Sequence, residues 1–553
     1  MNEYSFIKQD RCRRRFTINK KRRENDKYHR ILEAAIKIFA ENGFFQSTIA
    51  QIAKEAGVAD GTIYLYFKNK DDILVQFFNY KTKQVFGRFR EEVDKAEGAI
   101  DKLQNLIRRH LQEFQADPNM AMAYWGEAMT HNHSLWHEQN FDQGLAVVQK
   151  LKSIKSDAPA TPLEKDFVKA VKILYESDSV KIKRDKNYAD FMQTLSQKYP
   201  DNHEVAAFYA LSLLGSISDG RDVETYGKGA NIAKGILEEN PNHPGALHYL
   251  IHSYDDPEHA ALALSAADAY SVVAPDASHA LHMPSHIYVA MGMWDKVVSS
   301  NENSYQASLN RMKAKNLSND ARGYHAYHWL EYGYLQQGRI DDARKLVEDM
   351  ATYTLETPSV RARAHMVYLK GTYLVESEEW DGEIADIPVK IDDLNLSVRS
   401  QYRFLEGMKA FKEDNKNTLD TLIMTMKKEL DKEAYLVTYD NAAFCSGADR
   451  NDTSPSMLLE SEIMMYQLKA LKSWLEDDPE TTETYLKKTI ELENGLSYSY
   501  GPPVIQKPTH ELYGDWLFEV NRGQEAFEQY ELTLKRAPKR RKAEEGMTKI
   551  QKA

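Results

Sequence analysis

The 553-residue sequence contains only two cysteines, Cys12 and Cys445, which lie far apart in the chain. So few thiols exclude a disulfide framework and a cysteine-based zinc site, and we expect both to be free. No apolar run approaches the roughly 18–20 residues that a membrane-spanning helix requires. The N-terminus also lacks the uninterrupted apolar stretch of a signal peptide. We therefore expect a cytoplasmic protein that does not contact a membrane.

The sequence also lacks the short motifs of several common catalytic sites. It shows no glycine-rich phosphate loop, no dinucleotide-binding fingerprint, no Gly-x-Ser-x-Gly elbow and no His-Glu-x-x-His zinc motif. These absences remove the sequence support for nucleotide-dependent chemistry and for the common hydrolase mechanisms. The leading interpretation is a protein with no cofactor and no enzymatic activity.

A net positive charge is confined to the start of the chain, and the rest of the chain is net negative. Residues 1–117 contain 23 Lys and Arg against 17 Asp and Glu, whereas the remainder contains 49 against 66. The first 30 residues alone hold 11 basic and four acidic side chains. A basic segment suits a polyanion such as DNA, so we interpret residues 1–24 as an arm that contacts phosphates or a groove, with a solvated tail as the alternative.

From Tyr28 the pattern becomes helical, because apolar residues recur at three- and four-residue spacing as far as Phe39. Thr48 is placed to cap a short second helix, and Gly57 can supply the left-handed turn that follows it. A third helix is expected over residues 59–67. Two short helices joined by a glycine turn, behind a longer helix, predict a helix-turn-helix whose last helix can enter the major groove of DNA.

The segment TIAQIAKEAGVADGTIYLYFKNKDDIL, residues 48–74, closely resembles the DNA-binding domain of the TetR family of bacterial transcriptional regulators. The resemblance extends over residues 25–85, with the helix-turn-helix motif at 48–67. It rests on the Ala-Gly-Val turn, the Gly-Thr-Ile-Tyr opening, the Tyr-Phe pair and the Lys-Asn-Lys-Asp exit, which occur in that order. The resemblance implies a double-stranded DNA operator as partner. It assigns DNA contacts to Thr48, Gln51, Ala59, Asp60, Gly61, Thr62, Tyr64, Tyr66 and Lys70.

The chemistry of these side chains suits such contacts. Gly61 lets the start of the helix approach the DNA backbone, Thr62 can donate to a phosphate or a base edge, and the Tyr64 hydroxyl can reach a phosphate oxygen. Ile63 and Phe67 are expected to face the core instead.

Two further helices are expected after the helix-turn-helix, at residues 71–96 and 100–115. Residues 86–117 resemble the start of the effector domain in fatty-acid-responsive TetR regulators. In that family, further helices complete a ligand pocket and a dimer-forming helix pair, and these do not follow here. We expect a homodimer that pairs without the usual TetR dimer helices.

Beyond these helices the chain changes character. The stretch NPNHPGALHYLIHSY, residues 240–254, aligns with APDASHALHMPSHIY, residues 274–288, at a spacing of 34 residues. Further units are expected at 321–346 and 510–538. A 34-residue period with a small residue in the second helix and a closing proline is typical of tetratricopeptide repeats. Residues 118–553 therefore resemble a bacterial tetratricopeptide-repeat protein, which implies an α-solenoid.

Thirteen of the 17 histidines lie between His131 and His328. Several occupy the same phases of successive repeats, at positions that share one face of a helix. In tetratricopeptide folds this face of the first helix lines the concave groove. Seven histidines are therefore candidates for a ligand groove: His248, His252, His279, His282, His286, His325 and His328.

Three interpretations of these histidines remain open at this point. In the first, the imidazoles line a polar groove and form hydrogen bonds with a peptide or small anion. In the second, they are structural side chains between packed helices, with their hydrogen bonds satisfied there. In the third, they bind a metal. The metal interpretation rests on His248, His252, His282 and His286, whose i, i+4 pairs can chelate Zn²⁺. Glu511, which follows His510 in the chain, is the one acid that we single out. The sequence does not show both a base and an open metal position.

Together these features predict an all-α protein, with an N-terminal TetR-type three-helix helix-turn-helix domain followed by a tetratricopeptide-like α-solenoid. The leading hypothesis is a DNA-binding transcriptional regulator whose solenoid binds a peptide, a protein or a small molecule. The alternative is that the solenoid is the active part, as an interaction scaffold or a metal-dependent hydrolase, and that the helix-turn-helix is an appendage.

Overall fold

The computed structural model divides the chain into two compact units, residues 1–119 and 120–553, and each is described by itself. The expected basic arm at 1–24 and the connecting helices expected at 86–117 lie outside the described residues. The structure describes residues 27–39, 46–77, 121–136, 138–153, 161–176, 179–217, 220–439 and 453–552.

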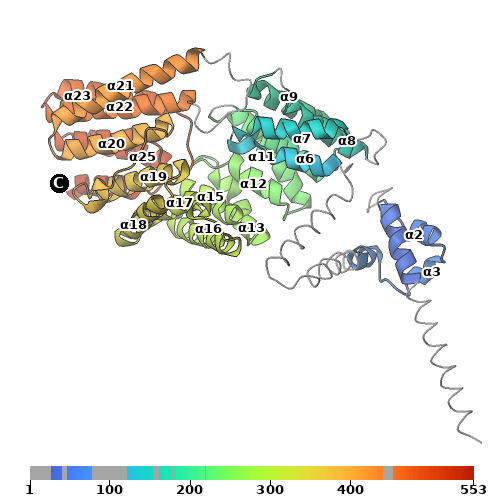
Figure 1. The fold of residues 1–553 in the computed structure, drawn as a ribbon. Helices are drawn as coiled ribbons and strands as arrows, with labels where there is room; N and C mark the ends of the chain where they lie inside the picture. The colour runs from blue at the N-terminus through green and yellow to red at the C-terminus, as the bar shows by residue number, and fades with distance from the viewer. Residues whose placement is uncertain are drawn as a thin grey trace, which may run out of the picture. The chain divides into compact units, whose positions relative to one another are not determined.

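The first unit contains the predicted helix-turn-helix, shown in blue in Figure 1. A helix at 27–39 is followed by α2 (Ile49–Ala56), α3 (Asp60–Ile63) and a helix at 70–77. Helix α3 is shorter than predicted, because the last part of the expected segment forms a turn. Glycine, threonine, isoleucine and tyrosine, which have low helix propensity, make up most of this stretch, so a single helical turn forms.

Local sequence determines where α2 begins and ends. The Thr48 hydroxyl accepts a hydrogen bond from the Gln51 backbone N–H at 3.3 Å, and the Gln51 side chain accepts one from the Thr48 N–H at 2.8 Å, which completes a capping box. Gly57 ends the helix in the left-handed conformation with φ 63°. Arg30 donates to the Ala56 carbonyl at 2.5 Å and fixes this turn to the preceding helix. The core between the helices contains Ile31, Leu32, Ile52, Ala53, Ile63 and Phe67.

In the part that the structure describes, the second unit is an array of helices with one short β-hairpin. Its strands β1 (Asn132–His133) and β2 (Glu138–Gln139) pair antiparallel. Among the described residues, no helix combines the length and the apolar character that crossing a bilayer requires. The helices are α6 (Ala121–Met129), α7 (Phe141–Ser153), α8 (Pro162–Ile173), α9 (Lys181–Lys198), α10 (His203–Gly215), α11 (Val223–Glu239), α12 (Pro244–Ser253), α13 (Leu264–Val273), α14 (Ser278–His282), α15 (Pro284–Ala290), α16 (Trp294–Ala314), α17 (Tyr324–Gln336), α18 (Ile340–Glu356), α19 (Val360–Ser377), α20 (Leu396–Lys412), α21 (Lys416–Tyr439), α22 (Pro455–Leu475), α23 (Pro479–Asn494), α24 (Thr509–Glu519), α25 (Gly523–Arg536) and α26 (Arg541–Lys552).

Successive helices of this unit pack against their neighbours along the chain, which confirms the predicted helical solenoid (Figure 1). The four stretches singled out in the sequence each begin a helical pair: α12 with α13, α14 and α15 with α16, α17 with α18, and α24 with α25. The small residues Ala343 and Ala526 are fully buried in the second helix of their pairs. Ala263 is also buried, but it ends a short 3₁₀ turn before α13. At the start of this turn the Asp256 carbonyl accepts hydrogen bonds from the backbone N–H groups of His259 and Ala260.

The end of the chain folds back onto the middle of the solenoid through a buried ionic cluster. Arg540 is fully buried, and its guanidinium contacts Glu511 at 2.6 Å and Glu376 at 2.5 Å. Lys507 contacts the same Glu511 carboxylate at 2.9 Å. The guanidinium also donates to the hydroxyl of Tyr332, 208 residues earlier in the chain, at 3.3 Å. The cluster therefore joins α17, α19 and α24 to the start of α26.

Backbone contacts beside this cluster strengthen the same closure. The Trp294 indole N–H donates to the Lys539 carbonyl at 3.0 Å, and the Arg541 backbone N–H donates to the Gln336 side chain at 2.9 Å. Gly292 has φ 62°, and a Cβ built on it would overlap the backbone at Pro538. Glycine is therefore required here both by the backbone conformation and by the close approach of the returning chain.

We predict that Arg540→Met destabilises the full chain by about 3–5 kcal/mol, because it leaves the Glu376 and Glu511 carboxylates buried without their principal partner. Urea unfolding followed by circular dichroism measures the loss. The control is Arg522→Met, which removes a partly exposed ion pair with Glu483 and should cost about 1 kcal/mol or less. Equal losses in the two variants would contradict the structural role of Arg540.

Candidate functional site

The helix-turn-helix presents the start of α3 to solvent. Ala59, Asp60 and Gly61 are exposed, Thr62 is half-buried, and Tyr64 is 59% exposed. Among the described residues outside its own helix turn and chain neighbours, no heavy atom lies within 4 Å of a Cβ built on Gly61, so a DNA backbone can approach closely at this point. Five of the nine predicted DNA contacts therefore form one accessible surface around the first turn of α3.

The other four predicted DNA contacts have partners within the unit. Thr48 and Gln51 form the capping box of α2. Tyr66 packs at the edge of the core, and the Lys70 ammonium donates to the Ser47 carbonyl at 3.1 Å. These four residues hold the motif in shape, and their contact with DNA stays a prediction.

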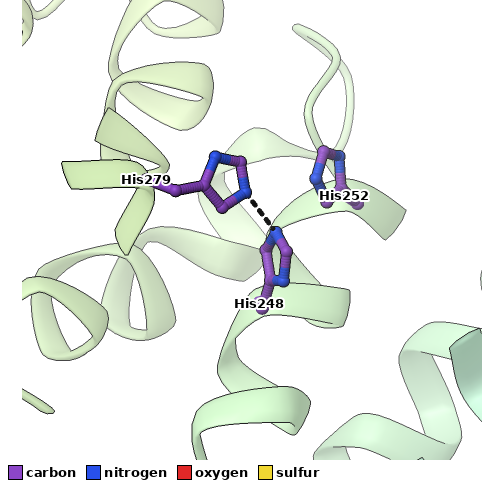
Figure 2. A group of neighbouring side chains, drawn as sticks. All are labelled: His248, His252 and His279. Atoms are coloured by element: carbon purple, nitrogen blue, oxygen red, sulfur yellow. Dashed lines mark hydrogen bonds between the residues drawn. The ribbon is translucent and has the colours of Figure 1, made fainter. Parts of the chain in front are cut away.

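Six of the seven candidate groove histidines come together where α12, α14, α15 and α17 meet. His248 and His252 lie one turn apart on α12, and Nε2 of His279 lies 3.1 Å from Nε2 of His248 (Figure 2). We call these three residues the first trio. The second trio consists of His282, His286 and His325. In each trio, one potential ligand atom from every residue lies within 4.8 Å of the other two.

Asp255 joins the two trios. It is fully buried, and its carboxylate lies 3.2 Å from Nδ1 of His286 and 3.5 Å from Nδ1 of His252, while Arg221 pairs with its other oxygen. Burial alone would raise the pKa of Asp255, but hydrogen bonds from the two histidines and the charge of Arg221 lower it below its usual range. An ionised carboxylate only accepts hydrogen bonds, so both rings carry their proton on Nδ1 and keep the lone pair on Nε2.

Asn301 fixes the ring of His282 in the same way. The Asn301 amide nitrogen donates to the Val297 carbonyl at 2.8 Å, so its oxygen is the atom that faces Nδ1 of His282 at 2.7 Å. Nε2 of His282 and Nε2 of His252 are both buried, and neither has a hydrogen-bond partner among the described residues. Buried polar atoms in folded proteins are usually paired, so these two nitrogens mark the cluster as a candidate site.

Burial favours the uncharged form of His248, His282 and His286. Desolvation lowers the pKa of His286 and lowers the pKa of His248 and His282 well below the usual value, and neighbouring imidazoles act in the same direction. A neutral imidazole has one nitrogen that can accept a hydrogen bond or bind a metal ion.

The cluster borders a cavity of about 1180 Å³. His252 and His325 lie on its wall, together with tyrosine, tryptophan and valine side chains and several charged groups. The segment before α24 contributes another part of the wall, where the Tyr500 ring lies 4.7 Å from that of His286. Gly501 has φ 93°, and a Cβ there would overlap the Trp329 ring. The volume is that of a site for a ligand of substantial size.

His328 and Glu511 lie apart from the cluster. Nε2 of His328 is 2.8 Å from the Thr372 hydroxyl, and the ring stacks on Tyr368. Glu511, the acid singled out in the sequence, instead pairs with Arg540 in the closing cluster.

The sequence analysis missed Asp255, Asn301 and Arg221. Asp255 had a recognisable signal in the sequence, because it follows His252 by only three residues and lies just beyond the end of α12. Asn301 and Arg221 come from distant segments, and no local pattern marks them.

The comparisons with known proteins concern the N-terminal unit above all. Residues 31–77 match the family described as "Bacterial regulatory proteins, tetR family". Over 119 residues the chain is 41% identical to the fatty acid metabolism regulator protein of Bacillus subtilis (strain 168). The aligned region covers 22% of this chain and 61% of that protein. It is 41% identical over 70 residues to the HTH-type transcriptional regulator HbdR of Aromatoleum sp. (strain CIB). Here the aligned region covers 13% of this chain and 29% of that protein. The chain thus spans less than two thirds of each relative.

Among solved structures, the chain is similar to one described as "Human IFIT1 dimer with m7Gppp-AAAA". The similarity covers 74% of this chain and 77% of that one, with 12% sequence identity and a TM-score of 0.34. Residues 31–77 are a TetR-type helix-turn-helix domain on the evidence of their sequence match and their fold.

We predict that His328 makes the fold sensitive to acid. Burial and the neighbouring His365 lower the pKa of His328 to about 3, whereas an unfolded histidine titrates near ~6.5. As the pH falls, the unfolded chain therefore takes up a proton at His328 before the folded chain does. The contribution of neutral His328 to the free energy of unfolding is complete above the pKa of the unfolded histidine and is lost progressively below it. Between about pH 7.5 and 5.5, His328→Gln should lose about 1 kcal/mol less stability than the wild type, measured by urea unfolding.

The glutamine in this variant can still bond Thr372, so packing is largely kept while the titration is removed. The control is His203→Gln, which replaces a half-buried histidine on α10 paired with Glu239. The prediction is wrong if His328→Gln loses as much stability as the wild type over this pH range.

Proposed function

We propose that this protein regulates transcription by binding an operator through its TetR-type helix-turn-helix domain, and that a small molecule or peptide bound in the solenoid cavity controls that binding. The observation that carries the proposal is the match of residues 31–77 to the TetR family, on a fold whose α3 start is exposed. The names of the two relatives, both regulators, agree with it. The protein acts in the cytoplasm, where the operator is.

The cavity supports the control step by its position and size. Its wall combines residues from α12, α17 and α19 with the segment before α24, elements from widely separated parts of the solenoid. A ligand that fills about 1180 Å³ contacts all of them at once. It can therefore favour one arrangement of the solenoid over another by its difference in affinity for the two.

The proposal includes a homodimer, since TetR-type motifs read palindromic operators with two copies of the recognition helix. The solenoid, or the part of the chain that joins it to the helix-turn-helix, supplies the pairing surface. Light scattering of the full chain is expected to give the mass of two chains. A monomer at micromolar concentration would contradict this part of the proposal.

The DNA-binding step is tested with duplexes selected from a random library by the full-length protein. We expect the affinity for the selected duplex to fall as salt rises, because phosphate contacts release counterions. Tyr64→Phe should weaken binding by about tenfold, since the lost hydroxyl bonds a charged phosphate. Fluorescence anisotropy measures the change. Tyr435→Phe, at a tyrosine that is 60% exposed on α21, is the matched control.

Two results would overturn the DNA-binding step. One is the failure of the wild type to enrich any duplex, and the other is equal affinity of wild type and Tyr64→Phe for the enriched sequence.

The ligand step is tested by filling the cavity. Ala364→Trp places an indole on the cavity wall, whereas Leu355→Trp places the same group at an 85% exposed position on α18. Mass spectrometry of native and denatured protein should detect a small molecule or peptide that copurifies with the wild type and with Leu355→Trp. Its amount should fall several-fold in Ala364→Trp. Adding the released ligand should change the affinity for the selected duplex, and no change would contradict a control function.

A further inference from the structure

We propose that the two histidine trios are metal sites, each of which binds one divalent transition-metal ion, with Zn²⁺ as the expected ion. The first site consists of His248, His252 and His279, and the second of His282, His286 and His325. The proposal concerns the solenoid alone and does not depend on DNA binding. Its basis is the geometry of the nitrogen atoms and the polar groups that orient them.

The first trio already has the spacing that a metal ion requires. His248 and His252 project from successive turns of α12, and their ring centres are 4.9 Å apart. His279 enters from α14, and its Nε2 lies 3.1 Å from Nε2 of His248, as Figure 2 shows. Two nitrogens bound to one tetrahedral zinc ion at about 2.0–2.1 Å lie roughly 3.3 Å apart. Small rotations of these rings would therefore accommodate the ion.

The second trio repeats the arrangement one helical pair further along the chain. His282 and His286 lie at 2% and 3% exposure, and their ring centres are 5.1 Å apart. His325 comes from α17, with its ring centre 4.6 Å from that of His282. Trp329 packs against both buried rings. The tryptophan ring limits the rotation of these two imidazoles.

In both trios, polar groups that accept a hydrogen bond from Nδ1 of a ring leave Nε2 as the nitrogen that can bind the metal. Metal-binding histidines usually donate their other ring N–H to a carboxylate or carbonyl oxygen, which fixes the ring and its tautomer. Asp255 provides this acceptor for His252 in the first trio and for His286 in the second. Asn301 provides it for His282. In each case Nε2 is left with a lone pair directed away from the acceptor.

The unpaired nitrogens distinguish a metal site from a set of structural histidines. A structural histidine in a core finds a hydrogen-bond partner for each ring nitrogen. Here Nε2 of His252 and Nε2 of His282, one in each trio, are buried without a partner among the described residues. One metal ion in each trio satisfies the unpaired nitrogen there and uses its lone pair as it stands.

The donor set also selects the class of ion. Neutral imidazoles suit Zn²⁺, Cu²⁺, Ni²⁺ and Co²⁺, whereas Mg²⁺ and Ca²⁺ prefer oxygen ligands. Each trio includes one exposed histidine, His279 or His325, so solvent reaches the ion. Three protein nitrogens and an accessible fourth position leave room for water or for a donor atom of a ligand in the cavity.

Charge predicts that the two ions bind with unequal strength. Asp255 lies between the trios and supplies one negative charge to both, while Arg221 offsets part of that charge. Two nearby dications repel each other in a partly buried site. We therefore expect the second ion to bind more weakly than the first.

Equilibrium dialysis of the metal-stripped full chain against Zn²⁺, with metal analysis, should give two ions per chain. His279→Ala and His325→Ala should each bind one, and the double variant none. Both substitutions are at exposed positions, so the fold should survive them, and circular dichroism checks this. His328→Ala, at a histidine on the same helix as His325 but outside both trios, should bind two.

Substitution of Co²⁺ for Zn²⁺ reports the coordination geometry of the bound ion. Bound Co²⁺ should show the intense visible absorption of a four-coordinate nitrogen site, and half of it should disappear in each single variant. Asp255→Asn should weaken both sites by about 10–100-fold, the usual effect of losing the group that orients a ligand histidine.

The proposal is overturned if the wild type binds no Zn²⁺ at micromolar concentration, if the double variant keeps two ions, or if both single variants lose all binding. The last result would mean one shared site in place of two. Retention of full Zn²⁺ binding by Asp255→Asn would exclude its role in orienting the ligands. DNA affinity is measured in the same samples, so failure of metal binding is distinguished from failure of the helix-turn-helix.

Discussion

The buried contact of Arg540 with Glu376 and Glu511 is the constraint on which the second unit depends. A solenoid normally contacts only its sequence neighbours, so its two ends are free to move apart. Here the guanidinium, fully buried, ties the last helices to α17 and α19. Desolvated charges tolerate little displacement, because each must keep its partners to offset the cost of burial. The closure is therefore specific as well as stable.

The closure also creates the environment of the histidine cluster. The segment before α24 reaches the cluster only because the chain has returned, and it brings Tyr500 and Gly501 against His286 and Trp329. This contact covers the rings and completes one wall of the cavity. The shielding from water lowers the pKa of His248, His282 and His286, which favours their neutral form. Asp255, held by Arg221, then decides which nitrogen of two of these rings carries the proton.

The first unit is organised by local interactions instead. The capping box of Thr48 and Gln51, the left-handed Gly57 and the small apolar core all involve residues close in the chain. Such a motif can therefore be recognised from the sequence. It carries the surface that contacts DNA in our proposal, whereas the solenoid carries the cavity and the histidines. The two proposed activities thus rest on different kinds of structure.

These differences explain what the sequence determined by itself. The motif at 48–67 and the 34-residue period predicted the helix-turn-helix and the helical solenoid correctly, because both arise from local spacing. The repeat phase also predicted that histidines would gather, and six of seven do so. Only the tertiary structure placed His328 elsewhere, assigned Glu511 to the closing cluster, and brought Asp255 and Asn301 behind the rings. Those contacts join residues distant in the chain, and no local pattern specifies them.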